Sequence, residues 1–364
     1  MGTLKCRKYY APGAVGTLVI VIIACFIGFH KPQIIDIHEH IESLERAEVL
    51  LSADREENVT RTVLLPSPVE TLTLNGHKSF TGYRENTDEL FKIKEKYPEQ
   101  FDVLCTVSPL EPDALQYIKD CVKRGAVGIK LYNGHSYYHD IFSVPLDSPR
   151  MNPIYAYAEK NRLPVLYHVN ITKYGDELER VLQSYPDLVV NVPHYMVSSI
   201  GLDKVKALLD KYPNLYTDIS FGSPEYMAAG FRRLSNNTTK YESFMKEYSD
   251  RILFGTDMVL TSAQDKDFDF IQKTLACYRD LLEEKSFRCD LVSDYYADLL
   301  RDTEIRYEQC KPKEGDYCEN LKVKLDAIKV RHAEVLTLNG LNLSPAVLKK
   351  IYRDNPRRFL NANG

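Results

Sequence analysis

The chain has 364 residues, of which 44% are apolar and 27% charged, and its formal net charge is −4. This composition is that of a globular protein, long enough for one large α/β domain or two smaller ones. The charge is small and evenly spread, without a run of lysine and arginine, which argues against a nucleic-acid partner.

An uncharged apolar run, residues 14–29, follows Lys5, Arg7 and Lys8. It is shorter than the ~20 residues of a typical spanning helix but within reach of one, and the basic residues predict a cytoplasmic N-terminus. A secretory signal, or a bacterial lipoprotein signal ending at Cys25, has the same layout, and a buried core helix is the remaining alternative. We predict a signal-anchor or transmembrane segment at residues 1–30, with the rest of a membrane-anchored or exported chain extracytoplasmic.

Short strand-like runs follow, rich in β-branched or aromatic residues and bounded by Pro, Gly, Asp or Asn, as is typical of buried parallel strands. They lie at residues 34–38, 59–66, 101–108, 126–132, 163–169, 187–195, 214–220 and 251–258. Helical patterns separate them, such as residues 42–57 and 202–213. This α/β alternation predicts a (β/α)8 TIM barrel over residues 33–364. A doubly wound open sheet is the alternative, but it usually has fewer strands and a Gly-rich phosphate turn.

Residues 277–335 interrupt the alternation with a highly charged composition and four cysteines: Cys277, Cys289, Cys310 and Cys318. Their spacings are not C-x-x-C, which argues against a zinc knuckle. We predict a Cys-containing helical insertion after the eighth strand, with two disulfides of undetermined pairing or four free buried thiols. The barrel pattern then resumes with a helix that has Ser344 as its cap and Pro345 at its first position.

Metal-competent side chains stand at the ends of five predicted strands. They are His38 and His40 on the first, Lys130 on the fourth, His168 on the fifth, His194 on the sixth and Asp257 on the eighth. Side chains alternate along a strand, so the first two histidines point the same way, and a barrel brings all carboxyl strand ends to one face. Imidazole and carboxylate are ligands for zinc, manganese or iron, and we predict one or two divalent ions, zinc foremost.

The order H-x-H, Lys, His, His, Asp on successive strands resembles the amidohydrolase superfamily. The flanking stretches IIDIHEHI, GIKLYNG, LPVLYHV, NLYTDIS, LFGTDM and IYRDNPRRFLN are similar to its amidohydrolase-related branch. The resemblance implies either two ions bridged by a carboxylated Lys130 or a single ion. In the single-ion arrangement, Asp257 and three histidines, His38, His40 and His168, hold the ion. His194 then orients or deprotonates the water, and Lys130 binds a substrate anion.

Loops near the same face supply candidates for substrate binding: Arg84, Tyr132, Asn133, His135 and Tyr195. Asp257 and His194 are the predicted catalytic residues, with Asp257 accepting and passing on the proton of a metal-activated water. We therefore expect a metal-dependent hydrolase of an amide, lactone or ester carbonyl in a small molecule. A metal-dependent non-oxidative decarboxylase and a non-catalytic, membrane-tethered binding domain are the alternatives, and a homo-oligomer is left open.

Overall fold

A computed structural model describes residues 31–73, 79–262, 266–313 and 315–360. The predicted signal-anchor segment, residues 1–30, lies outside these residues. Among the helices that are described, none is both long enough and apolar enough to cross a membrane. The chain divides into two compact units, Met1–Pro32 and Gln33–Gly364, and all the described helices and strands belong to the second unit.

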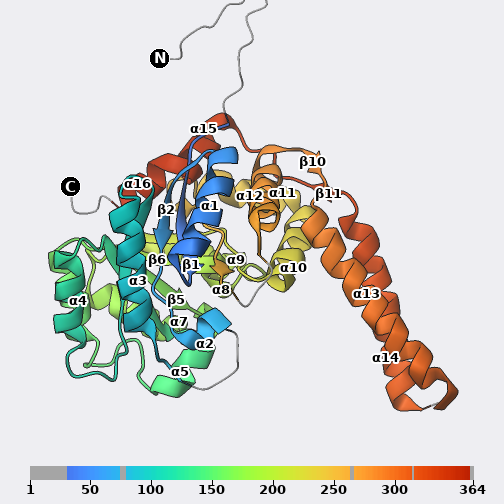
Figure 1. The fold of residues 1–364 in the computed structure, drawn as a ribbon, viewed down its shortest axis with the longest axis horizontal. Coiled ribbons are helices and arrows are strands. Elements are labelled where there is room, and N and C mark those ends of the chain that lie inside the picture. Colours follow the sequence, from blue (N-terminus) through green and yellow to red (C-terminus); the bar gives the residue numbers. More distant parts are fainter. Residues whose placement is uncertain (1–30, 74–78, 263–265, 314, 361–364) are drawn as a thin grey trace, which may run out of the picture. The chain divides into compact units, whose positions relative to one another are not determined.

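A curved sheet of nine parallel strands forms the centre of the second unit (Figure 1). The strands are β1 (Ile34–Ile41), β2 (Val59–Leu64), β3 (Phe101–Thr106), β4 (Gly128–Gly134), β5 (Val165–Val169), β6 (Val190–Val192), β7 (Leu215–Asp218), β8 (Ile252–Leu253) and β9 (Met258–Leu260). Their order is β8-β7-β6-β5-β4-β3-β2-β1-β9. β8 and β9 stand at opposite ends of this order, yet they are consecutive in the chain. The arrangement is consistent with the predicted TIM barrel.

The segment between β8 and β9 bonds to β1. The Ile37 amide donates to the Phe254 carbonyl at 3.1 Å, and the Asp257 amide donates to the His38 carbonyl at 2.7 Å. The last predicted strand, residues 251–258, is therefore two short strands separated by an irregular stretch. The other seven predicted strands overlap β1 to β7, but the end of the sixth, residues 193–195, belongs to the helix Pro193–Val197.

Two apolar clusters cover the two faces of the sheet. The smaller cluster combines strand residues with one residue of the last helix: Ile35, Ile37, Val63, Leu65, Leu104, Leu166, Tyr216, Leu253 and Phe359. Residues from strands that are not neighbours in the sheet meet only across its concave side, so this cluster fills the interior. The larger cluster packs the opposite strand faces, including Val103 and Ile129, against helical residues such as Ile118. Each strand is thus buried on both faces, as expected of a parallel sheet.

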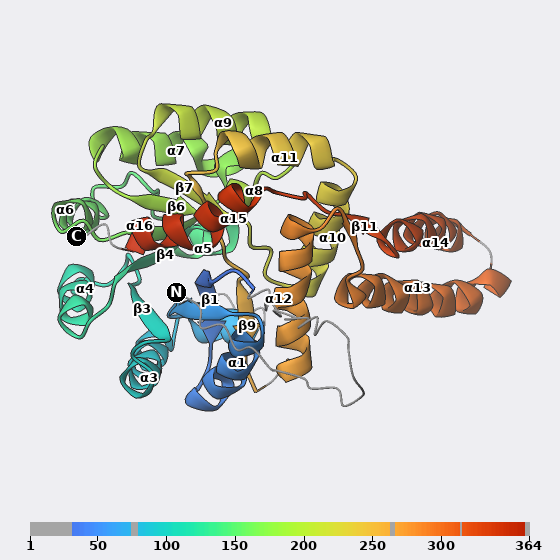
Figure 2. The same ribbon diagram turned by 90° about the horizontal axis from the view of Figure 1, so that it is seen from above.

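Most helices lie around the outside of the sheet, while the last helix contributes Phe359 to the interior cluster (Figure 2). They are α1 (Leu44–Glu56), α2 (Val69–Thr73), α3 (Tyr83–Lys96), α4 (Ala114–Lys123), α5 (Ser136–Phe142), α6 (Asn152–Lys160), α7 (Ile171–Ser184), α8 (Pro193–Val197), α9 (Leu202–Lys211), α10 (Pro224–Ser235), α11 (Thr238–Glu247), α12 (Phe268–Glu283), α15 (Pro345–Lys349) and α16 (Asn355–Leu360), with the turn η2 (Lys350–Asp354) between the last two. Local signals explain several ends. The Ser43 hydroxyl accepts from the Arg46 amide at the start of α1, and Gly125 takes a φ of 101° just after α4.

The insertion is a pair of long helices, α13 (Asp290–Cys310) and α14 (Asp316–Val335), joined by the turn η1 (Lys311–Lys313). The antiparallel strands β10 (Ser286–Phe287) and β11 (Leu338–Asn339) close its base. Both ribbon views show this helical hairpin projecting from the rest of the unit (Figures 1 and 2). The predicted start of the insertion, residue 277, lies inside α12, so the departure from the barrel pattern begins later than predicted.

Disulfides connect the cysteines of this region as Cys277–Cys289 and Cys310–Cys318. This is one of the pairings left open by the sequence, and it replaces the alternative of four free thiols. A further disulfide, Cys105–Cys121, joins β3 to α4 and was not predicted.

Candidate metal centre

The six predicted metal-site residues come together at the carboxyl-end face of the sheet. Five of them line one cavity of about 670 Å³: His40, Lys130, His168, His194 and Asp257. The sixth, His38, is fully buried beside this cavity, and its Nε2 atom lies 3.2 Å from Lys130 Nζ. The strand-end rule used on the sequence therefore selected side chains that the fold gathers in one place.

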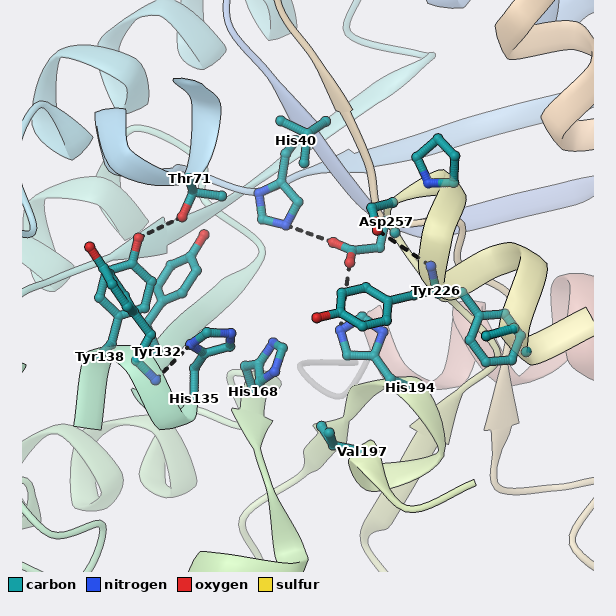
Figure 3. Close-up of a pocket in the computed structure, with 18 of the residues that line it drawn as sticks. His40, Thr71, Tyr132, His135, Tyr138, His168, His194, Val197, Tyr226 and Asp257 are labelled. Atoms are coloured by element: carbon teal, nitrogen blue, oxygen red, sulfur yellow. Dashed lines mark hydrogen bonds and ion pairs between the residues drawn. The ribbon is translucent and has the colours of Figure 1, made fainter. Parts of the chain in front are cut away.

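Asp257 is at the centre of the group (Figure 3). Its Oδ1 atom lies 3.0 Å from Nε2 of His38 and 3.0 Å from Nε2 of His40, and its Oδ2 atom lies 3.6 Å from Nε2 of His194. The backbone of Asp257 has a φ of 59°, in the left-handed region that non-glycine residues rarely adopt. Such strain is typical of functional sites, and here it occurs where the chain turns between β8 and β9.

Hydrogen bonds on the far side of each imidazole orient the ring. Nδ1 of His38 lies 3.2 Å from Asp218 Oδ2, and Nδ1 of His194 lies 3.0 Å from the Ser220 carbonyl oxygen. A carboxylate and a carbonyl can only accept, so in both rings Nδ1 carries a proton. The lone pair of His194 is then on Nε2, and Nε2 of His38 can bind an ion once it has lost its own proton. Nδ1 of His40 is 2.6 Å from the Ser67 hydroxyl, which leaves its Nε2 facing Asp257 in the same way.

Burial sets the charge state of the imidazoles. It lowers the pKa of His40 to about 4 and also lowers the pKa values of His168 and His194, so these rings are neutral at pH 7. At His38 burial is again the largest single effect, but the charge of Asp257 and the hydrogen bonds to Asp218 and Asp257 together outweigh it, and the pKa is raised. Burial raises the pKa of Asp257, yet the neighbouring His38 and His194 hold it well below the usual range of a carboxyl. Asp257 is therefore ionised at neutral pH.

This donor set fits a divalent ion. Ligand atoms of His38, His194 and Asp257 all lie within 4.8 Å of one another in the described part of the chain. Neutral imidazole nitrogen and carboxylate oxygen are the donors that zinc and similar metals take. His168 lies outside this close group: its ring is 4.9 Å from the ring of His194 and 4.4 Å from that of His135. Its role as a ligand stays a prediction.

Lys130 shares the polar centre of the site. Burial lowers its pKa to about 8, against the opposing charges of Asp257 and Asp218. A lysine with a lowered pKa has a larger neutral fraction, which is what carboxylation requires. Its position next to His38 suits the bridging role and the substrate-binding role alike, so both predicted arrangements stay open.

Two of the five predicted substrate-binding residues, Tyr132 and His135, line the cavity. Nδ1 of His135 accepts from the Tyr137 amide at 3.2 Å, and burial lowers its pKa to about 4. His135 is therefore a neutral ring with its proton on Nε2. This makes it a hydrogen-bond donor in the cavity wall (Figure 3).

The predictions for Arg84 and Asn133 are corrected by the structure. Arg84 is at the start of α3, where its guanidinium bonds to Glu111 and, at 2.9 Å, to Asp113. Asn133 is only 1% exposed and accepts from the Tyr167 hydroxyl at 2.9 Å. Neither side chain lines the cavity. Both satisfy polar groups elsewhere in the fold, which sequence position alone did not indicate.

Tyr195 is the third correction, and the backbone explains it. Residues 194–197 of α8 all have φ between 52° and 59°, forming a left-handed turn. Such a conformation costs about 1–2 kcal/mol per residue. It presents His194 to the cavity and sends its neighbour the other way, so Tyr195 is fully buried with its ring 5.8 Å from that of Phe221. His194 therefore lines the cavity, while the next residue, Tyr195, lies in the core.

Sequence reasoning missed several residues of the site. Asp218 and Ser220 end the seventh strand in the stretch NLYTDIS, and the strand-end rule would have selected them had it been applied to every strand. Asp218 accepts from Asn191 Nδ2 at 2.9 Å and from the His194 amide at 3.0 Å, in addition to facing His38. Arg233 also lines the cavity, but it lies on α10, for which no helix was predicted.

This parallel barrel-type sheet defines a class of α/β proteins whose active sites lie at the carboxyl ends of the strands, and the imidazoles and carboxylate gathered there could hold a divalent ion. Within that class, the family model for amidohydrolases matches residues 35–287, and the chain belongs to this metal-dependent family. No curated protein sequence matches the chain.

Several solved structures share the fold. An uncharacterized TIM-barrel protein from Bordetella bronchiseptica is 14% identical, with 91% of this chain and 99% of that chain covered and a TM-score of 0.56. An amidohydrolase from Burkholderia multivorans is 11% identical, with 90% of this chain and 99% of that chain covered. Its TM-score is 0.51 in a crystal with bound HEPES and 0.50 in a crystal with bound zinc. At these identities the likeness concerns the fold alone.

Proposed function

We propose that the protein is a metal-dependent hydrolase acting on the amide, lactone or ester carbonyl of a small molecule. One observation carries the proposal: a single carboxylate, Asp257, faces Nε2 of His38, His40 and His194 at 3.0 to 3.6 Å. Three imidazole nitrogens that converge on one buried anion leave a position whose natural occupant is a cation. Membership of the amidohydrolase family supports the same conclusion.

In the single-ion arrangement, His38, His40, His168 and Asp257 would hold the ion and His194 would stay free. With two ions, His194 and Lys130 would be further ligands. We propose zinc because every donor is a nitrogen or an oxygen, with manganese or iron as alternatives. When bound, such an ion polarises a carbonyl group and lowers the pKa of water. The closed (β/α)8 form of the barrel is part of the proposal, supported by the bonds of residues 254 and 257 to β1.

The protein side chains supply the proton transfers. Asp257 is ionised, so its carboxylate can accept a proton from the attacking water and pass it to the leaving group. His194 is neutral, with its Nδ1 proton held by the Ser220 carbonyl, and its Nε2 atom can orient the water. The Nε2–H of His135 can donate to an oxygen of the substrate.

We also propose that this domain works outside the cytoplasm. Three disulfides lie within the described residues, Cys105–Cys121, Cys277–Cys289 and Cys310–Cys318. Disulfides persist in oxidising compartments and are rare in the cytosol of mesophiles. A signal or anchor at residues 1–30 would account for such a location.

Metal analysis of the purified protein, combined with a screen of lactones, N-acyl amino acids and aromatic carboxylates, tests the proposal. We expect stoichiometric zinc, manganese or iron, loss of turnover with EDTA, and recovery when the metal is returned. Release of CO₂ in place of hydrolysis products would assign the decarboxylase alternative. A chain that binds no metal and turns over none of these compounds would support the binding-domain alternative.

A further inference from the structure

The cavity has a tyrosine-rich wall on one side of the metal centre. Figure 3 shows Tyr132 and Tyr138 gathered next to His135, with the Tyr138 hydroxyl bonded to Thr71 at 2.7 Å. Across the cavity, Tyr226 directs its hydroxyl into the space between His168 and His194 (Figure 3). Aromatic side chains bind apolar or planar groups through their faces and edges. The wall therefore suits the apolar body of a small molecule.

The charged residues of the cavity differ in how far they are already engaged. Its carboxylates are occupied: Asp257 faces the imidazoles, and Glu70 accepts from the Thr81 hydroxyl at 2.9 Å and the Thr81 amide at 3.2 Å. Two of the cations are occupied as well. Lys130 contacts His38, and Lys266 Nζ donates to the Val259 carbonyl at 2.8 Å, with its pKa lowered by burial.

Arg233, the third cation, is different. Its Nη1 atom donates to the hydroxyl of Ser199, which also lines the cavity. Among the residues that the structure describes, no carboxylate forms an ion pair with its guanidinium, although its neighbour Arg232 pairs with Glu334 at 2.8 Å. A guanidinium has five N–H donors in a rigid fork that matches carboxylate and phosphate oxygens. Arg233 thus brings unused, charged donors to the wall of the cavity.

We propose that Arg233 binds an anionic group of the substrate, a carboxylate or a phosphate, while the apolar part of the substrate lies against the tyrosine-rich wall. The proposal deepens the proposed function, since it assumes that this cavity is the substrate site. The proposed role of Arg233 assigns the substrate to the class of small anionic molecules with an apolar part. The anion is held by Arg233, and the reacting carbonyl is left to the metal centre.

Binding to the metal-free protein tests this assignment without any turnover. After removal of metal with EDTA, we would titrate 3-phenylpropionate, its neutral amide 3-phenylpropionamide, and phenyl phosphate by calorimetry. We expect the wild type to bind an anion about 10- to 100-fold more tightly than the amide, since hydrogen bonds to charged groups contribute about 1.5–3 kcal/mol. The tighter of the two anions identifies the preferred group.

The variant Arg233→Gln should lose the preference, and Arg233→Lys should keep part of it, because a lysine retains the charge without the fork. Arg232→Gln is the matched control: it removes an adjacent arginine that does not line the cavity, and it should keep the full preference. Equal thermal unfolding temperatures would show that the variants fold.

Two results would overturn the assignment: a wild type that binds the amide as tightly as both anions, or an Arg233→Gln variant that still prefers the anion. A protein that shows the preference but hydrolyses nothing would contradict only the proposed function. A hydrolase without the preference would contradict only the role of Arg233.

Discussion

The metal centre and the α13–α14 hairpin are held together in opposite ways. At the centre, side chains from β1, β4, α8 and the β8–β9 junction meet although they are far apart in the chain, and most of them are buried. In the hairpin, consecutive helices pack on each other, and a disulfide between Cys310 and Cys318 closes the tip. Several of its ion pairs are local and exposed, such as Arg301–Asp298 at 2.7 Å.

This difference teaches where substitutions matter. A buried charge that loses its partner costs several kcal/mol, because water cannot replace the lost contact. An exposed ion pair three or four residues apart on a helix contributes at most about 0.5 kcal/mol. The centre should therefore respond strongly to changes of a few atoms, and the hairpin should tolerate them. The four predictions below test this contrast, from the largest expected effect to the smallest.

Asp257→Asn should reduce the turnover found in the substrate screen by about 10²–10⁴-fold, because an amide neither balances the ion nor accepts the proton. The same change at an exposed position of the hairpin, Asp298→Asn, should leave the rate unchanged. Rates measured on both variants with equal metal in the buffer would check this. An Asp257→Asn variant that keeps more than a tenth of the wild-type rate would contradict the role proposed for Asp257.

Asp218→Asn should weaken metal binding by about 10- to 100-fold while the fold is kept, since it removes the carboxylate that orients His38. Competition with a chromogenic chelator measures the affinity. The hairpin variant Asp302→Asn serves as the control. Asp218 acts through His38 and His194, so we expect the pH profile of any activity to shift as well. An unchanged affinity would show that the orientation of His38 does not depend on this residue.

Asp36 lies below the centre, and burial raises the pKa of its carboxyl to about 7. A raised pKa in the folded state means that folding favours the protonated form. The stability this confers is present below about pH 4 and is lost as the pH rises to about 7. Asp36→Asn should therefore increase the free energy of unfolding at pH 8 by about 1–3 kcal/mol, which raises the unfolding temperature. At pH 4.5 the same substitution should have much less effect on both quantities. Calorimetry of the metal-free protein measures both. An equal effect at the two pH values would contradict the assigned charge state.

Replacing Cys310 and Cys318 together by serine should have the smallest effect. The short loop they close lies at the tip of the hairpin, so we expect activity within about twofold of the wild type and faster proteolysis of the tip only. Replacing Cys277 and Cys289 should be more damaging, since both are buried in the main apolar core. A loss of activity in the tip variant would show that the hairpin contributes to the site.

How much of the fold could be predicted depended on whether the signal was local. Runs of β-branched residues bounded by Pro, Gly and Asp located β1 to β7, because buried parallel strands need that pattern. The helices after the seventh strand, α10 and α11, were not predicted, and with them Arg233 was missed. The insertion was recognised from its cysteines and charge, but its start was placed inside α12.

The candidate site shows the same limit. The six predicted metal-site residues do lie near one another, since a parallel barrel brings its strand ends together. Tyr195 was predicted to lie near the mouth because it directly follows His194, and nothing in the local sequence indicates a left-handed turn at residues 194–197. Arg84 was predicted from its place in the connection after the second strand and from its guanidinium, but the carboxylates that bind it come from a different segment of the chain.

The sequence by itself determined the alternation of strands and helices and the chemical types available at the strand ends, because periodicity and residue chemistry are properties of short stretches. Only the tertiary structure decided which imidazole nitrogens face Asp257 and that Asp218 contacts both the ring of His38 and the amide of His194. It also decided that Arg233 reaches the cavity without a carboxylate partner among the described residues. Those outcomes depend on contacts between residues separated by tens to hundreds of positions. Such contacts exist only once burial has excluded water from the space between them.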